Sequence, residues 1–254
     1  MELSKDSKTT IKRMLDLANK SYTQNMFTFT DFLSEGEQSL FYEAAKDFAF
    51  VKYQVFGGIE DAERVMIRFG NKEELGYEED FPIAIIKISP LLLKFSDYLS
   101  HRDYLGALMN LGVERSKMGD ILINNKTAYL FCEENIKDFI MDNLDKVKHT
   151  NVKLAQVAQV GEIQTKEPEI KSVMVSSMRV DAIISKTYNL SRSQCIEYFR
   201  QKKVFVNGRL FENNSGIIKA EDMISVRGLG RFKYAGIDRE TAKGKYMINI
   251  KIYK

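Results

Sequence analysis

Apolar residues recur at helical spacing near the start of the chain and then give way to short apolar runs. The helical stripe consists of Ile11, Leu15 and Ala18 and predicts an amphipathic helix. Ser34, followed three residues later by Glu37, is a capping-box pattern that predicts a second helix ending at Phe48. Strands are predicted over 51–56 and 65–69, and the acidic run 71–80 is expected to be a solvated connector. These elements predict a small α/β domain over residues 1–80.

The pattern over residues 81–165 alternates between apolar strands and amphipathic helices. In order, the sequence predicts a strand over 83–89, a helix from Ser100 and Asp103 to Gly112, strands over 119–123 and 127–131, a helix over 133–144 and a strand over 152–157. The residues predicted to share the inner face of the second helix are Ile136, Phe139, Ile140 and Leu144. Asn124-Asn125-Lys126 is typical of a hairpin turn. The order β-α-β-β-α-β predicts a ferredoxin-like middle domain, the arrangement that RNA-recognition modules also use.

A third domain is predicted over residues 177–254. Its expected elements are helices over 179–187 and 191–202 and strands over 204–206, 209–211 and 223–226. Asn207-Gly208 between two of these strands predicts a type I′ turn, and the glycines around Leu229 predict a flexible basic loop over 228–231. Residues 161–176 lack helical periodicity, and we interpret them as a linker or an exchanging strand. The overall fold class is therefore α+β with three domains.

Charge is divided unequally between the two parts of the chain. Residues 170–254 hold 17 of the 38 lysines and arginines and 7 of the 35 aspartates and glutamates, a net charge of +10. Residues 1–169 hold 21 lysines and arginines and 28 aspartates and glutamates, a net charge of −7. The charges of the two parts sum to the overall +3. This asymmetry indicates a C-terminal part that binds a polyanion, attached to a body that does not.

The start of the second helix in the C-terminal part is the best candidate for an anion contact. Ser191 precedes the helix, and Arg192 and Ser193 occupy its exposed first turn. A helix start presents unpaired N–H groups to an anion, and the planar guanidinium of arginine fits phosphate oxygens. Ile196 and Phe199 face inward, so that the basic side chains lie nearer the outer side. The alternative interpretation is an incidentally basic, solvated face.

Four short motifs of this region resemble the RNA-binding domain named for ribosomal protein S-four, also called the alpha-L motif. They are Arg179-Val180-Asp181, Ser191-Arg192-Ser193, Val204-Phe205-Val206-Asn207-Gly208 and Asp222-Met223-Ile224-Ser225-Val226. The usual pattern reads R-L-D, S-R-S/T, V-x-V-N-G and G-D-x-I-x-V. The chain departs from it at Val180, where leucine is usual, and at Glu221, where glycine is usual. The resemblance implies binding of folded RNA through the backbone and 2′-hydroxyl groups.

The body of the chain resembles the YlmH family, a bacterial group with an N-terminal domain, an RRM-like middle domain and a C-terminal S-four domain. The matching segments are Leu99-Ser100-His101-Arg102-Asp103-Tyr104-Leu105-Gly106-Ala107-Leu108, Leu111-Gly112-Val113 and Gly119-Asp120-Ile121. The resemblance implies that the partners are rRNA and tRNA on the large ribosomal subunit. Some members of the family act in ribosome-associated quality control of stalled nascent chains. Gene neighbourhood also links the family to cell division.

The resemblance also implies which residues bind RNA. Arg192 matches a basic residue with which S-four domains bind folded RNA. The resemblance implies that other cations of the region contact the RNA as well. The predicted RNA-binding set is Arg179, Ser191, Arg192, Ser193, Arg200, Lys202, Lys203, Asn207, Arg227, Arg231 and Lys233. His101 and Arg102 are candidates for a secondary RNA or ribosome contact, although His101 also suits a structural role at a helix start.

The middle domain lacks the usual aromatic RNA-binding motif. Tyr129 and Phe131 alternate along a central strand as RRM aromatics do, but the K/R-G-F/Y-G/A-F-V-x-F/Y run is absent. We therefore expect these two rings to be core or protein-contact residues.

Other classes of protein are disfavoured by the composition. Two cysteines without a CxxC pair argue against a zinc ribbon and suit a reducing cytosol. No apolar run is long enough to span a membrane, and the first residues do not form a secretory signal. No nucleophile–base pair or cofactor-binding glycine motif is evident. We expect a cytoplasmic, monomeric non-enzyme without cofactor, metal or small-molecule substrate.

Two other functions remain open from the sequence. One is a protein-interaction adaptor, for example in cell division, whose acidic N-terminal body recruits a partner. The other is an RNA-modifying enzyme whose catalytic motif is not recognisable.

Overall fold

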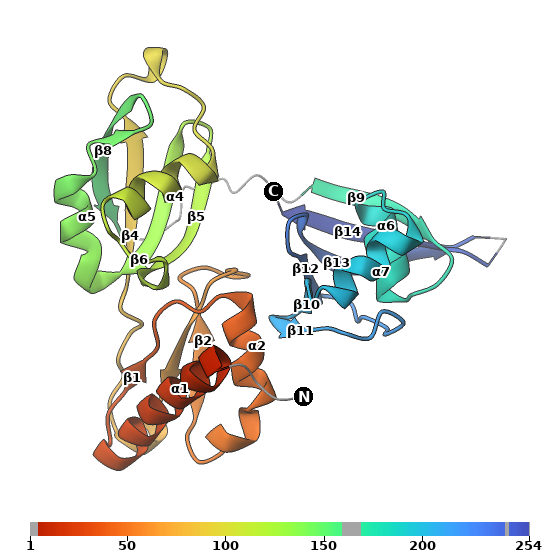
Figure 1. Ribbon diagram of the computed structural model, residues 1–254, viewed down its shortest axis with the longest axis horizontal. Coiled ribbons are helices and arrows are strands. Elements are labelled where there is room, and N and C mark those ends of the chain that lie inside the picture. The colour runs from red at the N-terminus through yellow and green to blue at the C-terminus, as the bar shows by residue number, and fades with distance from the viewer. Residues whose placement is uncertain (1–4, 159–168, 242–243, 254) are drawn as a thin grey trace. The chain divides into compact units, whose positions relative to one another are not determined.

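The computed structural model describes residues 5–158, 169–241 and 244–253. The chain divides into two compact units, residues 1–165 and 166–254, and each is described by itself (Figure 1). Both units combine helices with antiparallel sheets. The predicted mixed α and β character is confirmed, whereas the domain boundaries stay a prediction.

The first unit begins with a small three-stranded sheet of order β1-β3-β2 and the helices packed on it. The elements are α1 (Lys5–Gln24), β1 (Thr28–Phe29), α2 (Glu35–Glu43), a 3₁₀ turn (Ala45–Phe48), β2 (Tyr53–Phe56), β3 (Met66–Phe69) and α3 (Lys72–Leu75). The capping box of Ser34 and Glu37 opens α2 as predicted. The predicted helix end at Phe48 is wrong for the α-helix, which stops at Glu43 before the 3₁₀ turn. The acidic connector contains the short helix α3, capped by the side chain of Asn71.

A five-stranded antiparallel sheet forms the rest of the first unit, with strand order β5-β6-β4-β8-β7. The elements are β4 (Ile83–Pro90), a 3₁₀ turn (Leu93–Phe95), α4 (His101–Asn110), a 3₁₀ turn (Arg115–Lys117), β5 (Met118–Asn124), β6 (Thr127–Glu133), a 3₁₀ turn (Glu134–Ile136), α5 (Lys137–Asn143), β7 (Lys146–Val147) and β8 (Thr150–Val157). The predicted succession β-α-β-β-α-β is present. The short strand β7 was not predicted.

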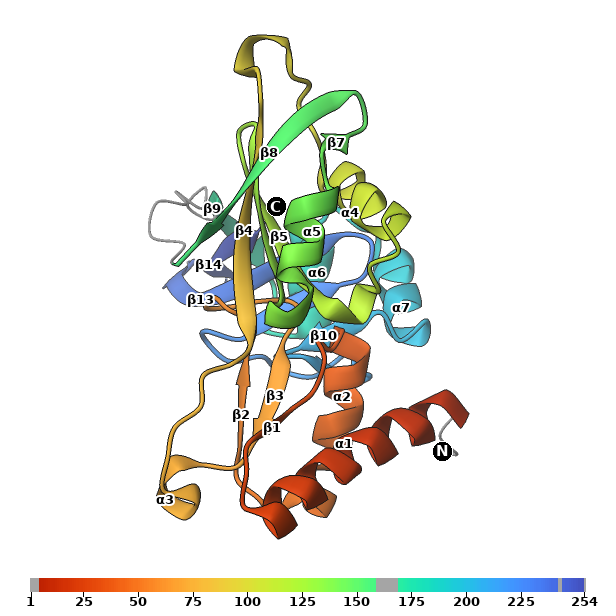
Figure 2. The same cartoon turned by 90° about the vertical axis from the view of Figure 1, so that its left-hand side faces the viewer.

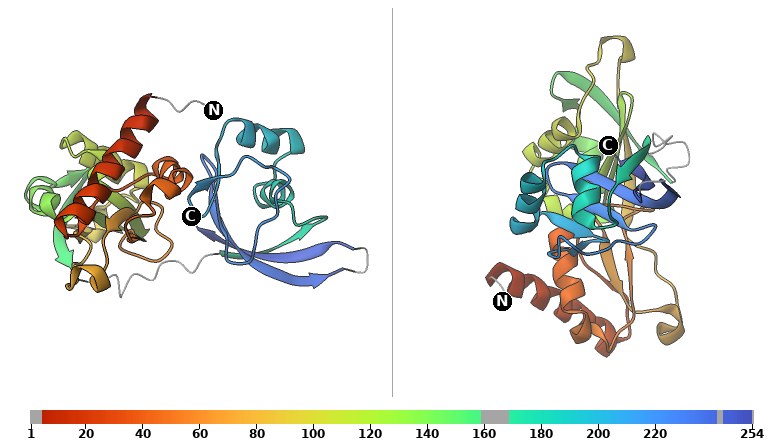
Figure 3. Two further views of the ribbon diagram at one scale, coloured as in Figure 1. Left: turned by 90° about the horizontal axis from the view of Figure 1, so that it is seen from below. Right: turned by 90° about the vertical axis from the view of Figure 1, so that its right-hand side faces the viewer.

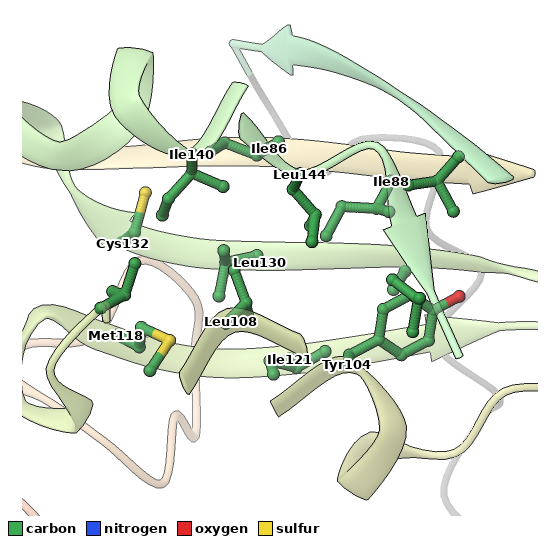
Figure 4. Close-up of a cluster of buried hydrophobic side chains, with 14 of the residues drawn as sticks. Ile86, Ile88, Tyr104, Leu108, Met118, Ile121, Leu130, Cys132, Ile140 and Leu144 are labelled. Atoms are coloured by element: carbon green, nitrogen blue, oxygen red, sulfur yellow. The ribbon is translucent and has the colours of Figure 1, made fainter. Parts of the chain in front are cut away.

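Helices α4 and α5 cover one face of this sheet and enclose its core (Figure 2). Leu108 from α4 and Ile140 from α5 pack against strand residues such as Ile86 and Leu130, and all four are fully buried (Figure 4). Phe139 was predicted to face inward with Ile140, but it is 48% exposed. Ile140 and Leu144 are buried as predicted and Ile136 packs against the same core, so only Phe139 lies off the predicted face.

The opposite face of the five-stranded sheet is partly covered by the N-terminal elements. Phe131 on β6 is fully buried in a cluster with Phe32 and Met66. The backbone at Gly58 has φ +95°, and a Cβ added there would lie 2.4 Å from Cδ1 of Phe131, so only glycine fits. The expectation that Tyr129 and Phe131 are core aromatics agrees with their burial, at 9% and 0% exposed.

A buried polar seam also joins the two sheets of the first unit. The Asp120 carboxylate accepts hydrogen bonds from the backbone N–H groups of Glu63 (2.7 Å) and Arg64 (3.0 Å). The Arg64 guanidinium donates to the carbonyl oxygens of Met118 (2.8 Å) and Phe32 (2.6 Å). Burial and the charge of Arg64 lower the pKa of the neighbouring Arg115 to about 10. The seam therefore needs the negative charge of Asp120.

The second unit is one antiparallel sheet of order β11-β10-β12-β13-β14-β9 within its described residues. Its elements are β9 (Glu169–Val175), α6 (Val180–Thr187), α7 (Arg192–Arg200), β10 (Val204–Val206), β11 (Arg209–Leu210), β12 (Met223–Val226), β13 (Gly230–Glu240) and β14 (Tyr246–Tyr253). Figure 3 shows α6 and α7 on one side of this sheet. Ile184 and Phe199 pack there against Phe232, Ile248 and Ile250.

Several predictions for the second unit can be compared directly. Asn207 and Gly208 have φ of 51° and 73°, as the predicted type I′ turn requires. The predicted basic loop is wrong in its second half, because Gly230 and Arg231 begin β13 and pair with β12. Of the segment predicted as a linker or exchanging strand, 161–168 lies outside the described residues, and 169–175 is strand β9, paired with β14.

Candidate nucleic-acid interface

The start of α7 is held in place by a complete capping box. Gln194 N–H donates to the Ser191 hydroxyl (3.3 Å), and Ser191 N–H donates to the Gln194 side chain (2.9 Å). Cys195 and Phe199 are buried and fix the inner side of the helix. Arg192 and Ser193 are consequently displayed to solvent on the first turn, as predicted. Ile196, predicted to face inward with Phe199, is only half-buried.

A shallow pocket of about 310 Å³ lies beside this helix start. Its walls come from the end of β9, from α6 and from the first residue of α7. Three cationic side chains line it, together with three serines and one carboxylate. These residues are Arg179, Lys186, Arg192, Ser176, Ser177, Ser185 and Asp181. The pocket can therefore receive an anionic group and supply it with several hydrogen-bond donors.

Arg179 is held by the buried carboxylate of Asp181. Its Nε and one terminal nitrogen donate to the two carboxylate oxygens at 3.0 and 2.6 Å. This pairing raises the pKa of Arg179 and fixes the plane of the guanidinium. Because Asp181 already balances its charge, Arg179 contributes less net positive potential to the pocket than Lys186 and Arg192 do.

Four other predicted residues lie away from the pocket and have partners of their own. Arg200 is paired with Glu197 at 3.1 Å, and Lys202 with Glu212 at 3.1 Å. The ammonium of Lys203 lies 5.9 Å from the centre of the Tyr198 ring. The Asn207 side chain donates to Asp222 and accepts from Met223 N–H, both at 2.8 Å, so it maintains the hairpin.

The remaining predicted residues lie on the other side of the sheet. In β13, Phe232 and Tyr234 point into the core beneath the helices, so Arg231 and Lys233 point to the opposite face. Arg227, just after β12, places its guanidinium 4.8 Å from the centre of the Phe205 ring. The set predicted from sequence as one site is therefore divided among the helix-start pocket, the four residues with partners elsewhere and the helix-free face of the sheet.

Lys251 and Tyr253 belong to this helix-free face and were missed by the sequence analysis. Lys251 pairs with Lys233 across β14 and β13, and Tyr253 pairs with Arg231. The alternation of apolar and polar residues over 246–253 is the signal that could have revealed the strand.

His101 and Arg102 occupy the first turn of α4, in the first unit. The capping box of Ser100 and Asp103 positions this turn, and the Asp103 carboxylate accepts from Ser100 N–H at 2.8 Å. Partial burial, followed by the charge of Arg115, lowers the pKa of His101. The imidazole is therefore mostly neutral near pH 7, and the positive charge of this turn comes from the exposed Arg102.

Comparisons with known proteins agree on one family. Residues 77–162 match the family described as "Putative RNA-binding domain in YlmH". The relative "Ribosome-associated protein quality control protein P2" of Bacillus subtilis (strain 168) is 28% identical over 254 residues, covering 98% of this chain and 96% of the relative. Residues 77–162 are therefore similar to the YlmH family, and the chain as a whole is similar to this relative.

The fold of the chain resembles a solved structure as well. "Cell division protein ylmH from Streptococcus pneumoniae" superposes with a TM-score of 0.51 at 20% identity, covering 65% of this chain and 98% of that chain. The matched RNA-binding domain contains the whole five-stranded sheet, from β4 to β8, and not the basic second unit.

The family model that matches this chain describes a putative RNA-binding domain. Burial raises the pKa of Cys132 to about 12 and also raises that of Cys195, so both remain protonated thiols at neutral pH. Within the described residues, no group of three or more His, Cys, Asp or Glu is arranged to hold a metal ion. None of the described helices is both long and apolar enough to cross a membrane.

Proposed function

We propose that this protein is a cytoplasmic, monomeric, ribosome-associated factor that binds rRNA and tRNA on the large subunit during quality control of stalled nascent chains. The basic second unit acts as an S-four-type RNA-binding domain and anchors the protein to RNA. Support comes from the name of the Bacillus subtilis relative and from the RNA-binding description of the family.

The observation that carries the proposal is the pocket at the start of α7. Lys186 and Arg192 bring two cations to a helix N-terminus whose capping box is complete, and Arg179 adds a third in a fixed orientation. Phosphate oxygens are the anions that such an arrangement fits best. The charge of +10 over residues 170–254 extends the attraction beyond the pocket.

The middle part of the chain contributes as an RRM-like domain with a modified surface. Its element succession and its strand order support that fold. Phe131, however, lies where RRM domains stack bases and is fully buried against Phe32 and Met66. RNA contacts of this domain must therefore use other residues, and Arg102 on the first turn of α4 is a candidate.

The test is sedimentation of a lysate through a sucrose gradient with Arg192→Ala, which removes one pocket cation. The expected loss of RNA-binding free energy is roughly 1–3 kcal/mol, the range for a charge-assisted contact, so the variant should leave the large-subunit fractions. Arg200→Ala is the matched control, because Arg200 ends the same helix, has a side chain 76% exposed and is paired with Glu197. Equal sedimentation of the Arg192 variant and wild type would remove the pocket from the binding site.

A second candidate function is a protein-interaction adaptor, and one surface favours it. The loop after β4 exposes Leu91, Leu92 and Leu93 at 55%, 66% and 65%, with Tyr98 at 81%. Contiguous exposed apolar residues of this kind often mark a protein contact. Adaptor function predicts that Leu92→Asp with Leu93→Asp abolishes a complex that survives nuclease treatment. Loss of every complex on nuclease treatment would contradict it.

A further inference from the structure

The helix-free face of the second unit's sheet is organised in rows that cross several strands. The pairing of β10, β12, β13 and β14 aligns one row, which consists of Phe205, Ser225, Arg231 and Tyr253. The next row crosses β12, β13, β14 and β9 and consists of Met223, Lys233, Lys251 and Ile170. Residues that alternate with these, such as Ile224, Phe232 and Ile250, lie in the core under the helices. Phe205 and Ser225 are buried, so the accessible part of the opposite face consists of Arg231, Tyr253 and the second row.

The charge of this surface is of one sign. Arg231, Lys233 and Lys251 lie in the two rows, Arg227 lies at their margin, and no described position of either row holds a carboxylate. Lys233 and Lys251 are direct cross-strand partners. Protein surfaces ordinarily mix both signs of charge. A surface with several cations attracts a polyanion.

Aromatic rings accompany the cations. The Arg231 guanidinium lies 5.5 Å from the centre of the Tyr253 ring, and the Arg227 guanidinium lies 4.8 Å from that of Phe205. The Phe205 ring is 3% exposed, whereas Tyr253 is half-buried and keeps part of its surface in solvent. Aromatic rings and guanidinium planes are the groups on which proteins stack unpaired bases.

We propose that this face binds an unpaired stretch of RNA. Tyr253 and Arg231 stack against bases, and Lys233 and Lys251 contact the phosphates that link them. The α7 pocket offers donors and charge to a phosphate but no aromatic ring, so it suits helical RNA backbone. This inference goes beyond the proposed function, because it gives the second unit two RNA-binding surfaces of different specificity. It rests on the proposed function only for the identification of the polyanion as RNA.

The first test uses the absence of tryptophan from the chain. A Tyr253→Trp variant of the full-length protein carries one tryptophan, whose emission reports stacking directly. Titration with a single-stranded oligouridine of about 12 nucleotides, within the span that such surfaces cover, should quench this emission. A duplex RNA of the same length should not. Tryptophan emission that does not change on addition of the oligouridine, while the duplex RNA binds, would overturn the proposal.

The second test separates the two surfaces. Lys233→Gln with Lys251→Gln should weaken oligouridine binding about tenfold and reduce the magnitude of its log–log salt slope by about 1.4, since each lost phosphate contact on a single strand contributes about 0.7. Arg192→Ala should weaken oligouridine binding less than the double variant does. Tyr253→Phe should retain binding and Tyr253→Leu should lose it, which distinguishes stacking from packing.

Unchanged oligouridine affinity in the double variant would reject the face as an RNA site, whatever Arg192→Ala does to ribosome sedimentation. A double variant that binds oligouridine normally but loses a nuclease-resistant protein complex would reject it in favour of a protein-binding face. If Arg192→Ala alone no longer sediments with large subunits, the proposed function is supported. The oligouridine titration then decides separately whether this face binds RNA.

Discussion

The two large sheets of this protein begin from the same plan and differ in what covers their second face. Each is antiparallel and has a pair of helices over one side, α4 and α5 in the first unit and α6 and α7 in the second. In the first unit, N-terminal residues such as Phe32 and Met66 pack on part of the other side. In the second unit, the other side carries a uniform set of cations.

The comparison shows that aromatic residues on strands are buried to different extents in the two units. Phe131 lies on a central strand of a sheet that is covered on both sides, and it is a core residue. Tyr253 lies on a strand that is covered on one side, and its ring remains accessible beside Arg231. An aromatic residue on a strand is therefore accessible to a ligand only when nothing else in the chain packs over it.

The largest expected effect on stability comes from truncating Phe131, and truncating Tyr253 provides the comparison. Phe131→Ala should lower the free energy of unfolding by about 3–5 kcal/mol, because it leaves a cavity in a closed cluster. Tyr253→Ala should cost about 1 kcal/mol or less, as expected for a half-exposed residue. Urea unfolding, followed by circular dichroism, measures both. Similar losses in the two variants would show that the second face is packed as tightly as the first.

The polar seam of the first unit offers a test of intermediate size. Asp120→Ala would leave the N–H groups of Glu63 and Arg64 without their acceptor. It would also remove the charge that balances the buried Arg64 and the half-buried Arg115. A loss of about 2–4 kcal/mol in unfolding free energy is expected. Asp138→Ala is the control, since that carboxylate is 84% exposed. If the two variants were equally stable, the N-terminal elements would not depend on the seam.

The smallest expected effect concerns the helix start that carries His101 and Arg102. Hydrogen bonds from Ser100 lower the pKa of Asp103 below 3.8. The capping box therefore contributes its full stability above pH about 4, and this contribution falls as the pH drops through the lowered pKa. Unfolding measured from pH 7 to pH 3 should show a steeper acid loss for wild type than for Asp103→Asn. Parallel curves would contradict the role of this carboxylate.

Local signals in the sequence predict much of the fold. The capping boxes at Ser34, Ser100 and Ser191 each begin a helix where expected, because the cap satisfies backbone donors within four residues. Asn207-Gly208 likewise predicts its own turn, since both residues tolerate positive φ. These features depend only on neighbours in sequence.

Features that depend on distant pairing could not be predicted in the same way. Strand β14 lies between β13 and β9, and β9 comes some 70 residues earlier in the chain, so its register cannot be inferred from local pattern. The candidate site shows the same limit. Arg192 was predicted from the helix cap beside it, but the assignment of Arg231 and Lys233 to a different face required knowledge of which side of β13 meets the helices.

The position of β9 and β14 as neighbours also has a consequence for biosynthesis. Strand β9 is the first element of its unit to be made, yet its partner β14 is the last, with both helices and four strands between them. Until β14 emerges, β9 has no pairing partner in its own sheet and exposes Val173 and Val175, which are buried in the finished sheet. The unit must therefore finish folding late, and a partly synthesised chain would be the form most prone to aggregate.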